Sequence, residues 1–276
     1  MLPFARDDAR VTASRPSDLR TRAIVGVALI CVAVAALLMG HILFWMLVSV
    51  AGVLMQAEWA GLIGADRKAR RLSMFAISVP LAIMAPDPLA AGPSFLSVGL
   101  LMGAALFVLA ITRSVRLALG IFYVGIPVLA LLFLRAQPVG VTPGGLLLAF
   151  WALGLVWATD IGAYFAGRSI GGPKLAPTIS PSKTWAGLLG GVVAALAFGF
   201  ALHQLAGLPA RFAAACGILA VAAQAGDLFE SAMKRRAGVK DSGTLLPGHG
   251  GVLDRLDGVV TVAPLAALLV AVPGLL

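Results

Sequence analysis

Charged residues are what this sequence has least of. Only 12% of its 276 residues are Asp, Glu, Lys or Arg, whereas 60% are hydrophobic and the mean hydropathy is +0.99. Soluble globular domains carry about 25% charged residues. This scarcity excludes an independent water-soluble core. Because apolar segments recur from about residue 23 to the last residue, the sequence predicts an integral membrane protein.

Cysteine is also scarce. The only two, Cys31 and Cys216, lie inside apolar runs, with no CxxC spacing and no histidine spacing around them. This excludes a disulfide framework and a cysteine-based metal site. We expect both side chains to be small buried hydrophobic groups.

The number of helices is predicted from the long stretches that contain no charge. No charge occurs between Ala23 and Ala57, an interval too long for one helix, since a single crossing needs roughly 20 residues. Apolar runs bounded by Pro, Gly or charge predict helices at about 23–39, 42–63, 72–86, 95–112, 115–134, 145–167, 186–203, 211–229 and 258–275. The predicted fold is therefore all-α, a polytopic bundle of about nine transmembrane helices.

The first 22 residues are too mixed in charge for a typical signal peptide. We expect residues 1–22 to be a cytoplasmic N-terminal tail and residues 23–276 to form a single polytopic membrane domain.

The net charge of +9 lies in short loops between apolar runs. With nine spans and a cytoplasmic N-terminus, every Lys and Arg except Arg135 and Arg211 falls on the cytoplasmic side. Cytoplasmic loops of membrane proteins are enriched in these residues. The basic residues are thus interpreted as topology signals and not as a face that binds nucleic acid, and no nucleic-acid partner is expected.

Several acidic residues occupy unfavourable places. Asp160 lies within an apolar run, and Asp227 and Glu230 close another. A carboxylate at membrane depth is costly, so such residues usually face a bundle interior or a wet cavity and mark function. The alternative for each one alone is a place at the interface, solvated or paired with a loop arginine.

A constellation of charge surrounds the run Pro247–Gly251. It comprises Asp227, Asp241, Asp254 and Asp257 together with Lys234, Arg235, Lys240 and Arg255. Carboxylates recruit Mg²⁺, cations neutralise phosphate oxygens, and glycines let backbone N–H groups approach an anion. The pattern is typical of phosphoryl or nucleotidyl transfer, in which the protein positions groups and stabilises charge.

A second cluster, residues 167–184, is predicted to lie on the same face. It combines Gly171-Gly172 with hydroxyl groups at Ser180, Ser182 and Thr184 and with the cations Arg168, Lys174 and Lys183. An ordinary basic loop would explain the charge but does not require so many Gly, Pro and hydroxyl residues. We favour anion binding.

The segment 231–257 resembles the signature of phosphatidate cytidylyltransferases, also called CDP-diglyceride synthases. The positions in register are Ser231, Met233, Lys234, Arg235, Lys240, Asp241, Pro247, His249, Gly250, Gly251, Asp254, Arg255, Leu256 and Asp257. The resemblance extends upstream to Gly226–Ser231, Asp160–Arg168 and Ser180–Thr184. It implies that the catalytic part spans about residues 155–260.

The resemblance implies transfer of a cytidylyl group from CTP to phosphatidic acid in the bilayer. The predicted topology places the active site on the cytoplasmic side of the cell membrane. The resemblance also implies Mg²⁺, with room for a second cation, and a homodimer. The expected catalytic residues are Asp227, Lys234, Arg235, Lys240, Asp241, His249, Asp254, Arg255 and Asp257, of which Asp227, Asp254 and Asp257 hold metal. The expected substrate-binding residues are Asp160, Arg168, Lys174, Ser180, Ser182, Lys183, Thr184, Gly250 and Gly251. His249 either donates to a phosphate oxygen or braces the glycine-rich turn.

One departure from the family pattern and several alternative functions remain open. The family usually has glutamate where this chain has Ala186, which also motivates a catalytically inactive scaffold. A CTP-dependent lipid kinase would transfer phosphate instead of CMP. A transporter would place polar residues near mid-bilayer in several helices. A CDP-alcohol phosphatidyltransferase shares the opening Asp254–Gly258, but Val259–Ala263 does not continue its motif.

Overall fold

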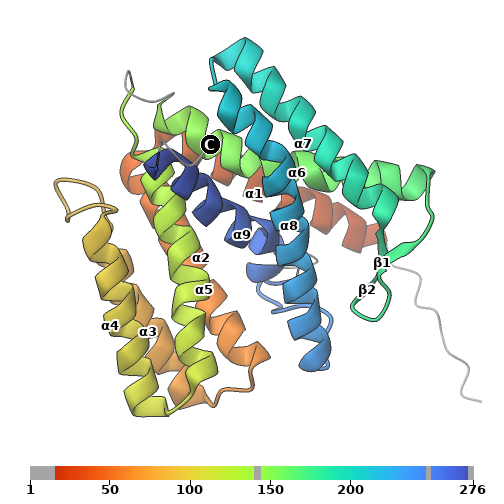
Figure 1. The fold of residues 1–276 in the computed structure, drawn as a ribbon. Coiled ribbons are helices and arrows are strands. Elements are labelled where there is room, and N and C mark those ends of the chain that lie inside the picture. The colour runs from red at the N-terminus through yellow and green to blue at the C-terminus, as the bar shows by residue number, and fades with distance from the viewer. Residues whose placement is uncertain (1–15, 140–143, 247–249, 273–276) are drawn as a thin grey trace, which may run out of the picture.

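The computed structural model describes residues 16–139, 144–246 and 250–272 (Figure 1). The described residues form nine helices and one two-stranded hairpin. The helices are α1 (Pro16–Met39), α2 (His41–Leu62), α3 (Arg67–Ile83), α4 (Phe95–Thr112), α5 (Val115–Arg135), α6 (Gly145–Ser169), α7 (Trp185–Ala206), α8 (Ala210–Arg236) and α9 (Leu253–Ala271). The strands are β1 (Lys174–Ala176) and β2 (Ser180–Thr184). The prediction of an all-helical chain thus missed this hairpin.

Short polar or glycine-containing breaks separate the helices. Asp66 caps α3, because its side chain accepts a hydrogen bond from the Ala69 amide at 2.7 Å. Gly207 ends α7 with φ at +74°, a conformation that glycine adopts without steric cost. These local signals explain why the predicted and observed helices agree in number and order.

Within the described residues, six helices are long and apolar enough to cross a membrane, namely α2, α4, α5, α6, α7 and α8. The apolar part of α1, Ile24–Met39, is shorter, and α3 and α9 are not among the six. Length and composition therefore indicate a multi-pass membrane protein.

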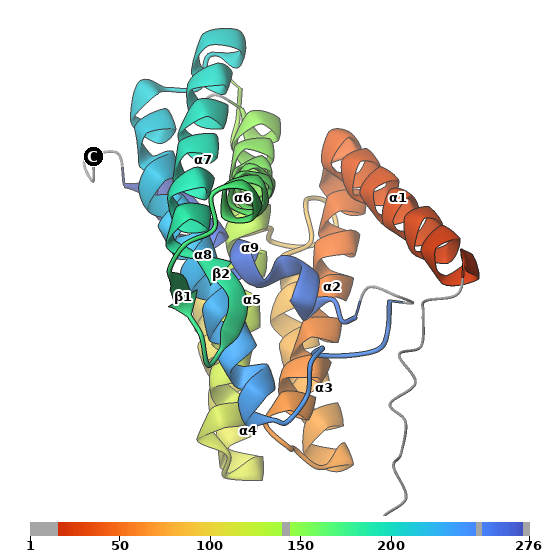
Figure 2. The same ribbon diagram turned by 90° about the vertical axis from the view of Figure 1, so that its right-hand side faces the viewer.

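The helices are arranged in two groups. Helices α2 to α5 pack side by side on one side of the molecule, and α6, α7 and α8 pack together on the other. Helix α9 lies between the groups, where it packs against α5, α6 and α8 (Figures 1 and 2). Helix α1 leans away from the bundle (Figure 2), and many of its apolar side chains are exposed.

The core includes buried side chains from every helix. Trp151 of α6 is fully buried; it stacks on Phe212 of α8 with ring centroids 5.2 Å apart and donates to Cys216 Sγ at 3.2 Å. Cys216 is therefore buried as expected. Cys31 is exposed on α1, which corrects the expectation of burial for that residue.

Helices α6 and α7 meet along a seam of small residues. A Cβ added at Gly162 would lie 2.4 Å from the Ala194 Cβ and 2.6 Å from the Gly190 carbonyl oxygen. A Cβ at Gly190 would lie 2.2 Å from that of Ala166. Such small residues let two helix backbones approach closely within a membrane. The seam fixes the start of α7, and with it the hairpin, against the end of α6.

Candidate active site

The hairpin connects α6 to α7 and is fastened at both ends. Strands β1 and β2 pair antiparallel, with Lys174 opposite Thr184. Gly171 and Gly172 turn the chain with φ values of +67° and +90°, which side chains rarely adopt. At the other end Thr184 caps α7, since its hydroxyl accepts from the Gly187 amide at 3.0 Å.

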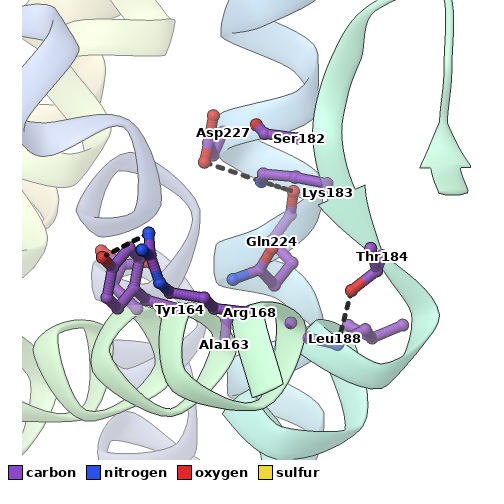
Figure 3. A pocket seen from close by; sticks show the side chains of 12 residues that line it. Ala163, Tyr164, Arg168, Ser182, Lys183, Thr184, Leu188, Gln224 and Asp227 are labelled. Atoms are coloured by element: carbon purple, nitrogen blue, oxygen red, sulfur yellow. Dashed lines mark hydrogen bonds and ion pairs between the residues drawn. The ribbon is translucent and has the colours of Figure 1, made fainter. Parts of the chain in front are cut away.

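A pocket of about 340 Å³ lies between the hairpin and helices α6, α7 and α8 (Figure 3). It is lined by Asp160, Ala163, Tyr164, Gly167, Arg168, Ser182, Lys183, Thr184, Gly187, Leu188, Gln224 and Asp227. Six of these residues belong to the predicted site: Asp160, Arg168, Ser182, Lys183, Thr184 and Asp227. The structure therefore brings the second cluster together with the acids of α6 and α8. Tyr164 and Gln224 were not predicted.

An ion pair closes one side of this pocket. Lys183 Nζ lies 2.7 Å from Asp227 Oδ2 and 3.4 Å from the Gln224 carbonyl oxygen (Figure 3). The Ser231 hydroxyl donates to the other Asp227 oxygen at 3.2 Å. These contacts fasten β2 to α8. They also leave both partners partly accessible, with the Lys183 side chain 15% and the Asp227 side chain 30% exposed.

Asp254, in the first turn of α9, is the centre of a second polar group. Its Oδ1 lies 2.6 Å from Lys234 Nζ, and its Oδ2 accepts from the Ser242 amide at 2.8 Å, the Ser242 hydroxyl at 2.9 Å and the Gly251 amide at 2.8 Å. Burial raises the pKa of this carboxyl, but the hydrogen bonds from Lys234, Gly251 and Ser242 outweigh burial and hold the pKa at about 2. Asp254 therefore carries a stable negative charge.

Lys234 is shared by two carboxylates. It lies 3.0 Å from Glu230 Oε1, one helical turn away on α8, in addition to its contact with Asp254. The Glu230 side chain is fully buried, and its Oε2 atom has no hydrogen-bond partner among the described residues. One ammonium group thus serves two buried acids.

Asp257 lies where α8 and α9 touch. A Cβ added at Gly226 would lie 2.7 Å from the Asp257 carbonyl oxygen, so only glycine permits this approach. The negative charges of Asp227 and Asp160 both act on the Asp257 carboxylate. Three predicted acids from α6, α8 and α9 therefore share one electrostatic environment.

The other predicted residues lie around these groups. Arg235 donates through Nε to the Ile179 carbonyl at 3.4 Å, so it extends toward the turn of the hairpin. Lys174, Lys240, Asp241 and Arg255 are exposed, and Ser180 lies in β2. Gly250 has φ at +77°, next to Asp241 and Asp254. His249 lies outside the described residues.

Glu58 is a residue that the sequence reasoning missed. It comes from α2, yet it accepts hydrogen bonds from the Val252 amide at 2.9 Å, the Leu253 amide at 2.8 Å and the Ser242 hydroxyl at 3.0 Å. A signal was available, because Glu58 is the first charge after the apolar run that begins at Ala23. A carboxylate inside a predicted span is by itself a reason to expect function.

Carboxylate oxygens are ligands that Mg²⁺ prefers. No group of three or more His, Cys, Asp or Glu side chains in residues 16–139, 144–246 and 250–272 is arranged to hold a metal ion. The donor chemistry nevertheless fits, since Asp160 and Asp227 line the pocket and the charges of both act on Asp257. Asp254 is less free, because its oxygens already accept four hydrogen bonds.

Comparisons with known proteins agree with this chemistry. The profile of the cytidylyltransferase family matches residues 20–272. A protein named phosphatidate cytidylyltransferase from Brucella suis biovar 1 (strain 1330) is 38% identical over 262 residues, covering 93% of this chain and 94% of that protein. The protein of the same name from Bacillus subtilis (strain 168) is 48% identical over 130 residues, covering 46% of this chain and 48% of the relative.

Proposed function

Because this chain belongs to the cytidylyltransferase family, we propose that it transfers a cytidylyl group from CTP to phosphatidic acid, which forms CDP-diacylglycerol and releases pyrophosphate. It is a nucleotidyltransferase of phospholipid biosynthesis. The observation that carries the proposal is the pocket in which the Lys183–Asp227 ion pair lies among helices able to span a membrane. A site of this kind can bind a water-soluble anion and an anionic lipid headgroup at the same time.

The chemistry needs little proton transfer. A phosphate oxygen of phosphatidic acid forms a bond to the α-phosphorus of CTP, the bond from that phosphorus to the bridging oxygen of the β-phosphate breaks, and pyrophosphate leaves with the electron pair. The attacking oxygen is already anionic at neutral pH. The barrier is therefore mainly repulsion between anions, which positioned cations reduce.

The cations have distinct proposed roles. Lys183 and Arg168, which line the pocket, bind phosphate oxygens of CTP with Ser182 and Thr184. Lys234, Arg235, Lys240 and Arg255 bind the lipid phosphate and the triphosphate, and Asp227 orients Lys183. Lys174, Ser180, Gly250 and Gly251 complete the substrate site, and His249 stays a predicted donor or brace.

Mg²⁺ is the proposed cofactor, held by Asp227, Asp254 and Asp257, with Asp160 and Asp241 as further ligands or outer partners. When bound, it would neutralise phosphate oxygens that the cations do not reach. The acids of the pocket support the Asp227 assignment most directly, because this side chain is partly exposed there.

We also propose nine membrane spans, a cytoplasmic N-terminal tail over residues 1–22, one membrane domain over 23–276 and a catalytic part over about 155–260. The site then lies at the cytoplasmic side of the cell membrane, and the chain works as a homodimer. Contacts at the two ends of the helical bundle support this topology. Glu58 meets Ser242 at one end of the bundle, and Arg135 Nε donates to the Leu37 carbonyl at the other, at 2.9 Å.

The test uses purified protein in detergent with phosphatidic acid, Mg²⁺ and CTP that carries its label at the α- or γ-phosphate. We expect α-label, and no γ-label, to enter the lipid phase with the wild type and with Asp87→Asn, an exposed acid outside the site. Asp227→Asn should lower this rate by more than about 10²-fold, since it releases Lys183. Label from the γ-phosphate in lipid would indicate a kinase, and no lipid label would overturn the proposal.

A further inference from the structure

A carboxylate of the N-terminal helices reaches the turn before α9. Glu58 projects from α2 and is buried, with only 6% of its surface exposed. Its two oxygens accept from three donors on residues 184 to 195 positions away: the Ser242 hydroxyl and the amides of Val252 and Leu253. Gly243 and Gly251 lie against it so closely that an added Cβ would come within 2.8 and 2.6 Å of its carboxylate oxygens.

These contacts replace a cap that α9 lacks. The first amides of a helix have no partner within the helix, and the residue that precedes α9, Val252, has no side chain that could cap them. Glu58 supplies the missing acceptor from a different helix. Its negative charge also lies at the helix N-terminus, where the helix dipole favours an anion.

A chain of polar contacts connects Glu58 to Lys234. Ser242 Oγ lies 3.0 Å from Glu58 Oε2 and 2.9 Å from Asp254 Oδ2, so the two acids share the single proton of one hydroxyl. Asp254 also accepts from the Gly251 amide, next to the amides that Glu58 holds. The other oxygen of Asp254 lies 2.6 Å from Lys234 Nζ.

We infer that Glu58 is a positioning residue for the transfer reaction: it fixes the α9 turn, Gly250–Leu253, so that Asp254 holds Lys234 toward the substrate phosphates. The inference rests on the proposed function, because that proposal gives Lys234 its phosphate. Glu58 itself touches neither substrate. Its effect passes through Ser242, the turn and Asp254.

Two substitutions at Glu58 are expected to lower the activity to different extents. Glu58→Gln keeps the volume and one acceptor oxygen, but turns an amide N–H group toward a backbone N–H. Glu58→Ala removes all three hydrogen bonds. We expect kcat/KM to fall about 10-fold for Glu58→Gln and on the order of 10²-fold for Glu58→Ala, with KM for at least one substrate raised. A change in active fraction alone would lower kcat and leave KM unchanged.

Asp66→Ala is the matched control. Asp66 also accepts from a backbone amide at a helix start in the N-terminal half, but it has no contact with the α9 turn. We expect wild-type kinetics for this variant. Hydrogen exchange followed by mass spectrometry should show faster exchange at residues 251–253 in both Glu58 variants and no change there in Asp66→Ala.

The outcomes separate this inference from the proposed function. If wild type and Asp66→Ala form no lipid product, the proposed function fails, whereas the exchange at residues 251–253 still reports whether Glu58 holds the turn. If the wild type is active and Glu58→Gln retains wild-type kcat and KM, the inference is overturned. It is also overturned if Glu58→Gln no longer folds at the assay temperature, since an architectural role would then account for the contacts.

Discussion

The N-terminal group, α2 to α5, and the C-terminal group, here taken as α6 to α8 together with α9, are held together by different kinds of contact. In the N-terminal group, buried aliphatic and aromatic side chains fill the space between helices, and indole groups bridge them, as in the bond from Trp45 Nε1 to the Leu81 carbonyl at 2.8 Å. In the C-terminal group, glycines bring backbones together, and Lys183 and Lys234 each pair with acids on other segments.

The difference separates an apolar scaffold from the part of the chain that carries the proposed site. Apolar packing tolerates changes that keep volume and hydrophobicity, whereas buried charges depend on every partner. All predicted site residues fall in the C-terminal group or in the loops that join its helices. Glu58 is a side chain of the N-terminal group that contacts the proposed site, because it accepts a hydrogen bond from the Val252 amide.

The largest expected effect is a loss of stability when a partly buried cation of the C-terminal group is removed. Lys234→Met leaves Asp254 and Glu230, which are 5% and 0% exposed, without their cation. Removing one partner of a buried pair costs about 3–5 kcal/mol. We expect a loss of this size in unfolding free energy, measured by denaturant titration in mild detergent, together with loss of activity.

Arg236→Met is the control for Lys234→Met, because Arg236 is exposed on the same helix. Its unfolding free energy should change by less than about 0.5 kcal/mol. Equal losses in the two variants would show that the charge of α8, and not the buried pairing, stabilises this half.

An intermediate effect on binding is expected from Lys183→Gln. Hydrogen bonds to charged groups contribute roughly 1.5–3 kcal/mol, so the Kd for CTP should rise about 10- to 150-fold. The unfolding midpoint should change little, because Asp227 is 30% exposed and water can solvate it. Equilibrium dialysis with labelled CTP measures the Kd. Lys68→Gln, an exposed cation on α3, should bind CTP as the wild type does.

The smallest effects come from adding one methyl group in each half. Gly162→Ala forces a Cβ against Ala194 and the Gly190 backbone, which should cost about 1–3 kcal/mol of stability. Gly103→Ala on α4 meets nothing within 4 Å and should gain about 0.5–1 kcal/mol, since glycine loses more entropy on folding. Thermal unfolding in detergent measures both. Similar shifts in the two variants would remove the contrast in packing.

The apolar pattern predicted the helices well, because hydrophobic runs and their breaks determine both burial and chain direction. The prediction 95–112 coincides with α4, and 115–134 ends one residue before α5 does. Errors occurred where polar residues continue a helix. Helix α8 extends from the predicted 229 to Arg236, and α9 starts at Leu253 instead of 258, because Glu230, Lys234 and Asp254 form ion pairs within those turns.

For the proposed site, the sequence identified residues that the structure brings close together, but it did not predict their contacts. Local motifs identified Asp160, Lys183 and Asp227, which the structure brings to one pocket. The hairpin was missed, because strands of three and five residues have too little pattern to register. The role of Glu58 depends on two helices that are distant in sequence and meet only in the fold.

The glycine seam between α6 and α7 restricts where lipid tails can pass between helices. Gly162 and Gly190 bring these two helices so close that even a methyl group does not fit between them. A hydrocarbon chain is wider than a methyl group, so neither tail of a diacyl lipid can pass through this seam. The tails of the lipid substrate must therefore stay in the bilayer along another side of the helices, so the seam limits the directions from which the lipid can reach the proposed site.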